Sequence, residues 1–198
     1  RRGNLTEVMG DGRVKHSYRY GAMNRLEWAG DGEGKAATYE YNGLGMRTGK
    51  TEGIRNATGN MGHTDPERKI RYTLDVTRQY HNLLQKTENG KVQSYLWDGN
   101  AAAFVDGTPD DVSGLQYYLQ DDLGSPIRLA DAGGVVIQSY GYDEFGQDLY
   151  GNGGMIQPFG FTGYEPDAIA GTAFAQAREY VSGLGRFAGM DVISGLQD

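Results

Sequence analysis

Apolar and polar residues alternate with a period of two along much of this chain, which is typical of β-strands. Several alternating runs end in two aromatic residues separated by one position, as in Tyr18-Arg19-Tyr20 and Tyr140-Gly141-Tyr142. Successive side chains point to opposite faces of a strand, so both aromatics of a pair should lie on one face. The pattern predicts strands, paired mainly with their sequence neighbours, at about residues 14–20, 36–41, 69–74, 91–97, 116–119, 135–142 and 174–180.

The aromatic pairs form an internal repeat. The second position of each pair falls at residues 20, 41, 74, 97, 118 and 142, with one longer step that contains an expected insertion at about residues 51–68. Glycine-rich turns precede the pairs, and short closing strands, such as residues 25–28 and 127–129, follow them. Each unit of about 21 residues therefore predicts one β-hairpin.

One segment leaves a choice between strand and helix. Residues 168–178 are rich in alanine, which suits a helix, but Phe174, Gln176, Arg178 and Tyr180 alternate with smaller residues and Glu179. We favour a single strand over residues 172–180, although periodicity alone does not decide so short a run.

The amino-acid composition excludes several classes of protein. The chain has 198 residues and no cysteine, which excludes a disulfide scaffold, a cysteine zinc site and a cysteine nucleophile. It has 32 glycines, 14 tyrosines and two tryptophans. Disordered chains are poor in aromatics, so this composition indicates a folded protein of short strands and tight turns.

Charge argues against nucleic acid as a partner. The formal net charge is -7, and the adjacent basic pairs Arg1-Arg2 and Arg68-Lys69 do not extend into a cluster. No run approaches 18 apolar residues, so we expect no membrane span. No signal peptide is visible, and the first residues read as though they came from the middle of a longer chain.

The C-terminal third carries the most specific motifs. Residues 117–126 read YYLQDDLGSP, residues 140–146 read YGYDEFG, and residues 161–165 read FTGYE. Residues 178–191 read REYVSGLGRFAGMD. Together with the tyrosine repeat, these motifs resemble, in order and spacing, the YD repeats and the associated core of the RHS family, which includes polymorphic toxins, toxin-complex shells and wall-associated proteins.

The resemblance implies an all-β fold in which antiparallel hairpins form a curved or spiralling sheet, the wall of a hollow shell. Residues 1–116 would be repeat hairpins, and residues 117–198 would be a truncated core segment. The implied function is to enclose a C-terminal toxin or other cargo. The expected partners are the remainder of a longer RHS chain or its toxin domain, and the expected location is secreted or on a bacterial cell surface.

The resemblance also implies a possible chemistry. In toxin members, the core segment often forms an aspartyl self-cleavage site with two acids, and Asp191 matches the first of them. Two close carboxyl groups cannot both ionise, so one donates a proton while the other accepts it. Arg186 could orient such an acid. The second acid segment is absent and Val192 replaces the usual proline, so we expect no self-cleavage from this chain alone.

The sequence gives less support to metal sites, cofactor sites and ligand-binding surfaces. His16, His63 and His81 are scattered, so we expect neither a metal site nor a cofactor. Residues 30–34 have some likeness to a calcium loop, but a hairpin turn explains them better, and residues 120–122 have only a weak likeness to one. A surface module that binds glycan or protein through tyrosines stays an alternative, as does the self-cleaving protease. Regular aromatic spacing favours packing instead.

Overall fold

The computed structural model describes residues 3–21, 23–55, 68–78, 81–108, 114–151 and 155–189. The chain forms two compact units, one from residues 1–67 with 167–198 and the other from residues 68–166. Within the described ranges the regular structure consists of β-strands and two short 3₁₀ turns, so the expected all-β antiparallel fold is confirmed.

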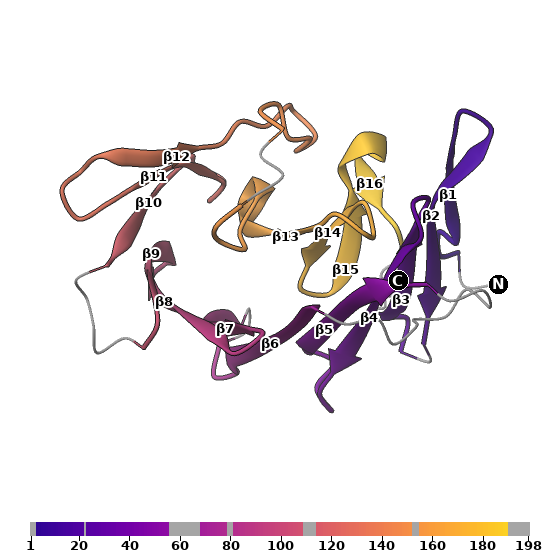
Figure 1. The fold of residues 1–198 in the computed structure, drawn as a ribbon, viewed down its shortest axis with the longest axis horizontal. Coiled ribbons are helices and arrows are strands. Elements are labelled where there is room, and N and C mark those ends of the chain that lie inside the picture. Colours follow the sequence, from indigo (N-terminus) through magenta and orange to yellow (C-terminus); the bar gives the residue numbers. More distant parts are fainter. Residues whose placement is uncertain are drawn as a thin grey trace, which may run out of the picture. The chain divides into compact units, whose positions relative to one another are not determined.

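The first unit begins with an antiparallel meander in which each strand pairs with the next (Figure 1). Its strands are β1 (Glu7–Gly10), β2 (Arg13–Tyr20), β3 (Leu26–Asp31), β4 (Lys35–Tyr41) and β5 (Arg47–Ile54). The chain returns to this unit at Asp167, and we call residues 167–189 the return segment. It contains β14 (Thr172–Ala175), β15 (Arg178–Val181), the 3₁₀ turn η2 (Ser182–Leu184) and β16 (Arg186–Phe187).

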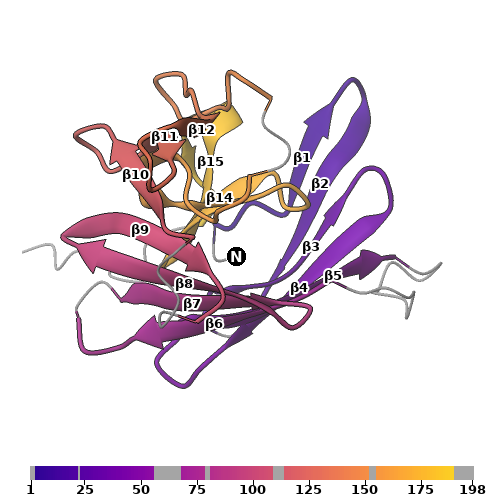
Figure 2. The ribbon, with the colours of Figure 1, turned by 60° about the vertical axis from the view of Figure 1, so that its left-hand side comes forward.

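The second unit continues the same hairpin topology (Figure 2). Its strands are β6 (Arg68–Asp75), β7 (Asn82–Glu88), β8 (Lys91–Asp98), β9 (Asn100–Asp106), β10 (Gln116–Gln120), β11 (Pro126–Ala130) and β12 (Val136–Ser139). The 3₁₀ turn η1 (Phe161–Gly163) and the first residues of β13 (Glu165–Asp167) follow.

Most predicted strands are confirmed. Those expected at residues 14–20, 36–41, 69–74, 91–97 and 116–119 correspond to β2, β4, β6, β8 and β10, and the strand expected at 135–142 is shorter. The first residues of the expected insertion, 51–54, continue β5, while residues 56–67 lie outside the described residues.

The single strand expected at residues 172–180 is wrong, because the chain folds there into the β14–β15 hairpin. Gln176 lies in the turn with a φ of 56°, a left-handed conformation that ends a strand. The Arg25 guanidinium donates hydrogen bonds to the carbonyl oxygens of Gln176 and Ala177. This reversal makes Phe174 and Glu179 cross-strand partners, so both lie on one face.

The aromatic pairs line the inner face of the hairpins. Tyr20, Tyr41, Trp97, Tyr118 and Tyr142 are partly buried, which confirms that the second member of each pair is at least half buried. The first member lies deeper, and this applies to Tyr18, Tyr39, Tyr72, Tyr95 and Tyr140, none of which is more than 8% exposed. The aromatic face is therefore a packing surface.

Each unit covers its own aromatic face with residues from later in the chain. In the first unit, Ile169 and Ala170 pack with Tyr18, Leu26 and Tyr39. In the second unit, the ring of Phe159 meets those of Tyr95, Trp97 and Tyr118 edge-on, with centroid separations of 5.4 to 5.9 Å. Such edge-to-face contacts add to the burial of the aromatic area.

A recurring five-residue turn explains the Asn or Asp that directly follows two of the aromatic pairs, at Asn42 and Asp143. Its first residue accepts hydrogen bonds through Oδ1 from the backbone N–H groups two and four positions later, at 2.7 to 3.0 Å. Its fourth residue is a glycine with positive φ. We call this the Asx turn; examples begin at Asp31, Asn42, Asp121, Asp131 and Asp143. The hairpin turn expected at residues 30–34 is confirmed.

Replacing the fourth glycine should destabilise the fold through the backbone alone. Gly134 has a φ of +81°, and an added Cβ would meet nothing within 4 Å, so Gly134→Ala isolates the left-handed strain. We expect a loss of about 1–2 kcal/mol in the free energy of unfolding, measured by urea denaturation.

Gly43 provides the matched control, since it lies in an equivalent turn, has no positive φ and also has open space at its Cβ. Gly43→Ala should leave stability nearly unchanged or raise it slightly. Equal losses at the two positions would show that the turn does not require positive φ.

Candidate functional site

Buried charged side chains occupy the inner face of the first unit beside the tyrosines. Arg47 and Lys50, both on β5, are only 2% and 6% exposed. On β4, Tyr41 is the register partner of Arg47 and Tyr39 is that of Lys50. Each tyrosine therefore has a cation opposite it in the neighbouring strand.

A β-bulge brings both cations to one face. Residues three apart in a regular strand point to opposite faces, because the side-chain period is two. The register shifts between Glu40 and Tyr41, so an extra β5 residue, Thr48, is accommodated between Arg47 and Gly49. The extra residue shifts the alternation of side chains along β5 by one position, so Arg47 and Lys50 both point toward the same interior.

The return segment supplies the partner of Arg47. The Arg47 guanidinium forms a buried ion pair with Glu179 of β15. The Thr172 hydroxyl donates a hydrogen bond of 2.7 Å to the other carboxylate oxygen of Glu179. The guanidinium carbon also lies 3.6 Å from the ring centroid of Phe174 and 4.3 Å from that of Tyr39, which are cation–π contacts.

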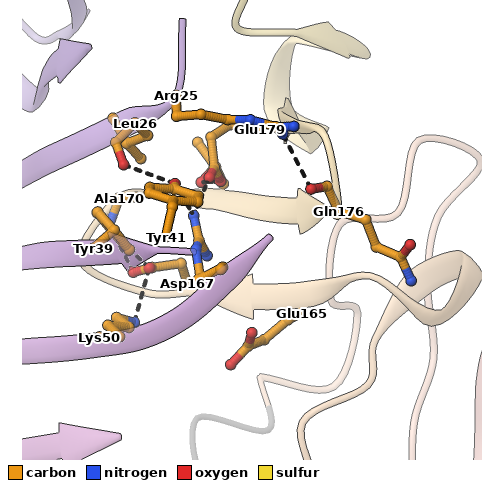
Figure 3. Close-up of polar contacts among 12 residues, drawn as sticks. Arg25, Leu26, Tyr39, Tyr41, Lys50, Glu165, Asp167, Ala170, Gln176 and Glu179 are labelled. Carbon is orange, nitrogen blue, oxygen red and sulfur yellow. Dashed lines mark hydrogen bonds and ion pairs between the residues drawn. The ribbon is translucent and has the colours of Figure 1, made fainter. Parts of the chain in front are cut away.

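The second ion pair joins Lys50 to Asp167, the first residue of the return segment (Figure 3). Lys50 Nζ lies 2.8 Å from Asp167 Oδ2 and 2.6 Å from Glu52 Oε1. The Tyr39 hydroxyl donates to Asp167 Oδ2 at 2.7 Å. The amides of Ile169 and Ala170 donate to Asp167 Oδ1 at 3.1 and 3.0 Å. This carboxylate is therefore surrounded by donors.

These surroundings fix the protonation states. Burial alone would raise the pKa of Asp167, but Lys50, the Ala170 amide and Tyr39 outweigh burial and lower it to about 2. Burial would lower the pKa of Lys50, but Asp167 and Glu52 raise it above its usual value. Burial raises the pKa of the Tyr39 hydroxyl well above its usual value, so it remains a donor.

Further contacts extend along the return segment. The Tyr18 hydroxyl donates to the Ala170 carbonyl oxygen at 2.7 Å, and His16 Nδ1 lies 3.0 Å from the Ile169 carbonyl oxygen. The Leu5 amide donates to the Ala188 carbonyl oxygen at 2.7 Å. We use the name clasp for Arg47, Lys50, Asp167 and Glu179 with Tyr39 and Thr172.

The clasp is arranged to hold the chain in place rather than to carry out a reaction. Asp167 and Glu179 are each paired with a cation, and both are almost completely buried. Proton transfer needs an acid or base that substrate can reach, and these carboxylates already have intramolecular partners. The geometry supports fixing the return segment to the meander.

The residues proposed from the sequence lie elsewhere. Arg186 is exposed on β16, where its backbone position pairs with Val181, and it does not belong to the clasp. Asp191 lies outside the described residues, so its expected catalytic role stays a prediction. Among the described residues, no three His, Cys, Asp or Glu side chains converge as metal ligands. In the same residues, no helix is long and apolar enough to cross a membrane.

The sequence analysis missed the clasp for two local reasons. Arg47 and Lys50 are three positions apart in sequence, so a regular strand would place them on opposite faces, and only the β5 bulge brings them to one face. Phe174 and Glu179 are five positions apart, and only the β14–β15 turn brings them to one face. One usable signal was β5 itself, whose first five residues read RTGKT without a large apolar side chain. A central strand without apolar residues can face an interior only if its polar groups find partners there.

Removing the charge of Glu179 should strongly destabilise the protein, because Arg47 would remain buried without its counter-ion. We expect Glu179→Gln to lower the free energy of unfolding by about 3–5 kcal/mol, measured by urea denaturation. The exposed Glu33→Gln serves as the control and should change little. The double variant Arg47→Met with Glu179→Leu should recover much of the loss, and an additive double loss would contradict this account of the pair.

Acid should weaken the clasp through Asp167. Its pKa is about 2 when folded and has a usual value of 3.8, so the unfolded chain binds the proton more readily. The stabilisation is complete above about pH 4 and is lost as the pH falls toward 2, by about 2 kcal/mol in total. Unfolding measured between pH 5 and pH 2 should show this slope. In Asp167→Asn the slope should be shallower, and an unchanged slope would assign it to other groups.

Comparisons with known proteins show which proteins resemble this chain in sequence and in fold. No family model matches the chain. Over 87% of its length, the chain is 24% identical to the tRNA nuclease WapA of Bacillus subtilis (strain 168), of which it covers 8%. The Photorhabdus luminescens Tc holotoxin pore matches 97% of the chain with a TM-score of 0.68 and 15% identity, and TcdB2-TccC3 matches 91% with a TM-score of 0.64 and 18% identity.

The chain spans less than a tenth of the length of each of these proteins. The two solved structures share its all-β antiparallel fold, and WapA shares detectable sequence along most of it. These matches agree with the tyrosine repeat and with the motifs of residues 117–191. The expected resemblance is confirmed, because the similarity to WapA and to the Tc toxin structures extends over most of the chain.

Proposed function

We propose that this chain is a wall segment of a hollow RHS-type shell that encloses a C-terminal toxin domain or another cargo. In this proposal residues 117–198 form the core-associated segment, and the whole protein is a secreted or surface-delivered bacterial protein. The observation that carries the proposal is the clasp, which fixes the return segment against the inner aromatic face of the meander.

The clasp suits a wall because a container must not open locally. Buried pairs are costly to break, since separation leaves charges without partners in a low-dielectric interior. Arg47, Lys50, Asp167 and Glu179 are all below 9% exposure and join β5 to the return segment at two points. Opening this region would therefore require breaking both ion pairs together with the tyrosine contacts around them.

The proposed partners are the remaining parts of a longer polypeptide. WapA is described as a tRNA nuclease, but this chain covers only 8% of WapA. A net charge of -7 does not favour binding to RNA phosphates, so we place any nuclease activity outside this segment. The same reasoning assigns any toxic activity to the enclosed cargo.

Tyrosine packing disfavours the alternative of a glycan-binding module. The hydroxyls of Tyr18, Tyr39 and Tyr72 donate to acceptors within the protein. Sugar recognition by stacking needs exposed ring faces, whereas these rings are at most 8% exposed. Among the described tyrosines, Tyr117 and Tyr150 are the exposed ones, at 44% and 61%.

The test is protection of the cargo in the full-length protein that contains this chain. Limited proteolysis of the folded protein should spare the C-terminal domain, while the same domain expressed alone should be digested. Glu179→Gln should speed digestion of the domain, because it weakens the wall at the clasp. The exposed Glu33→Gln is the matched control and should protect like the parent. A cargo digested equally fast inside the parent protein and alone would refute enclosure.

A further inference from the structure

A lysine amine and a carboxyl group are held against each other in the interior of the first unit. Lys50 Nζ lies 2.8 Å from Asp167 Oδ2, and the two side chains are 6% and 2% exposed. The contact joins β5 to the first residue of the return segment (Figure 3). It is an ion pair, but it also brings together the two groups from which an amide bond is made.

The amine is placed for attack on the carboxyl carbon of Asp167. Reacting atoms in a near-attack geometry are about 3–3.5 Å apart. Cγ is bonded to Oδ2, so an amine 2.8 Å from Oδ2 lies close to Cγ as well. An external substrate cannot reach these buried groups, but two groups of one chain need no access from solvent. The same burial keeps out the water that would reverse a condensation.

Glu52 is placed to take a proton from the amine. Its Oε1 atom lies 2.6 Å from Lys50 Nζ, and its side chain is 15% exposed. Only the neutral amine is a nucleophile. Burial lowers the pKa of Lys50, but Asp167 and Glu52 outweigh burial and raise it, so the neutral amine is rare. The step should therefore be slow, but each molecule needs to complete it only once.

The two oxygens of Asp167 face the donors that attack on its carboxyl carbon requires. The amides of Ile169 and Ala170 donate to Oδ1 at 3.1 and 3.0 Å. Paired backbone N–H groups stabilise the negative charge that develops on such an oxygen during attack. The Tyr39 hydroxyl donates to Oδ2, the departing oxygen, at 2.7 Å. Nucleophile, base, oxyanion donors and leaving-group donor therefore surround one carboxyl group.

We propose that Lys50 and Asp167 condense to an intramolecular amide bond, an isopeptide, which ties β5 covalently to the return segment. Glu52 accepts a proton from the ammonium group, and the freed lone pair of Nζ forms a bond to Asp167 Cγ. The C=O electrons move to Oδ1 and return as the Cγ–Oδ2 bond breaks. Oδ2 receives one proton from Glu52 and one from the attacking nitrogen, and it leaves as water. An ammonium and a carboxylate thus become a neutral amide and one water, and Glu52 returns to its starting state.

The bond would make one of the two points of the clasp permanent. The ion pair is the reactant, so the acid slope expected of Asp167 belongs to freshly prepared protein and should fade as the bond forms. The inference does not depend on the enclosure of a cargo, because every reacting group lies in this chain.

The second unit provides a matched lysine. Lys86 of β7 is the register partner of Tyr72 of β6, as Lys50 is that of a tyrosine on β4. Lys86 Nζ lies 3.1 Å from Oε2 of Glu88, two positions later in the strand. Lys86 therefore has an equivalent tyrosine and an equivalent base, but among the described residues it forms no ion pair with a second carboxylate. Its amine should remain free.

The experiment is peptide mapping of the full-length protein that contains this chain, denatured and digested with trypsin. An amide on Lys50 blocks cleavage there, so residues 48–55 should appear joined to residues 129–178, lighter than the two peptides together by one water. Trypsin should cleave after Lys86 as usual in the same digest. Separate peptides that end at Lys50, with no joined species after prolonged storage, would overturn the inference. Joining at Lys86 as often as at Lys50 would overturn it too.

Variants of the same protein separate the chemistry from the packing. Lys50→Arg keeps a cation but lacks the amine, and it should give no joined species. Glu52→Gln keeps the shape of the side chain and removes the base, so it should slow bond formation about a hundredfold, followed at intervals after a pulse of synthesis. The exposed Glu33→Gln is the control and should react like the parent.

A second catalytic variant keeps the test decisive if Glu52→Gln destabilises the fold. Tyr39→Phe retains the buried ring and removes only the hydroxyl at the departing oxygen, so it should also slow the reaction. A near-ultraviolet circular dichroism spectrum like that of the parent identifies the variants that remain folded. Folded Glu52→Gln and Tyr39→Phe proteins that form the bond at the parent rate would refute the roles assigned to these two side chains.

Discussion

A guanidinium group removed from water needs compensation nearby, and this constraint governs the first unit. Arg47 is 2% exposed, and the return segment supplies its buried counter-ion, Glu179, and the ring of Phe174 that stacks on it. Without residues 167–189, the inner face of β4 and β5 would present cations and tyrosine rings in place of a closed core. The meander and the return segment are therefore one folding unit, although more than 100 residues separate them in sequence.

Ionic pairs are not the most stabilising way to fill such a space. Apolar groups of similar shape often perform as well or better, because they avoid the cost of desolvating charges. Charged groups make the packing more specific, since the buried Arg47 side chain is stabilised by an acidic neighbour and destabilised by an apolar or a basic one. The two ion pairs, at Asp167 and Glu179, lie twelve positions apart on the return segment, and together they disfavour any shifted alignment of this segment on β5. We interpret the clasp as a device that selects one alignment.

The sequence predicted the regular part of this architecture and missed the irregular part. Alternation around Tyr18-Tyr20 and Tyr39-Tyr41 located β2 and β4, because a period of two is the direct signature of a strand with one buried face. The clasp depends on two breaks in that period, the extra residue Thr48 and the turn at Gln176. The turn at Gln176 is held by a distant residue, Arg25, which donates to the Gln176 carbonyl, and no local pattern contains this contact.

The repeated tyrosine links the regular hairpins to the irregular segment that covers them. A phenylalanine at the first position of each pair would pack as well, but it would bring no donor to the inner face. Tyr18 donates to the Ala170 carbonyl and Tyr39 to the Asp167 carboxylate, while Tyr72 of the second unit donates to Glu165. Burial raises the pKa of Tyr18 and Tyr39, so both hydroxyls keep their protons. A periodic ladder can thus satisfy the polar groups of a non-periodic strand, because the hydroxyls of Tyr18, Tyr39 and Tyr72 donate to a carbonyl in one case and to carboxylates in the others.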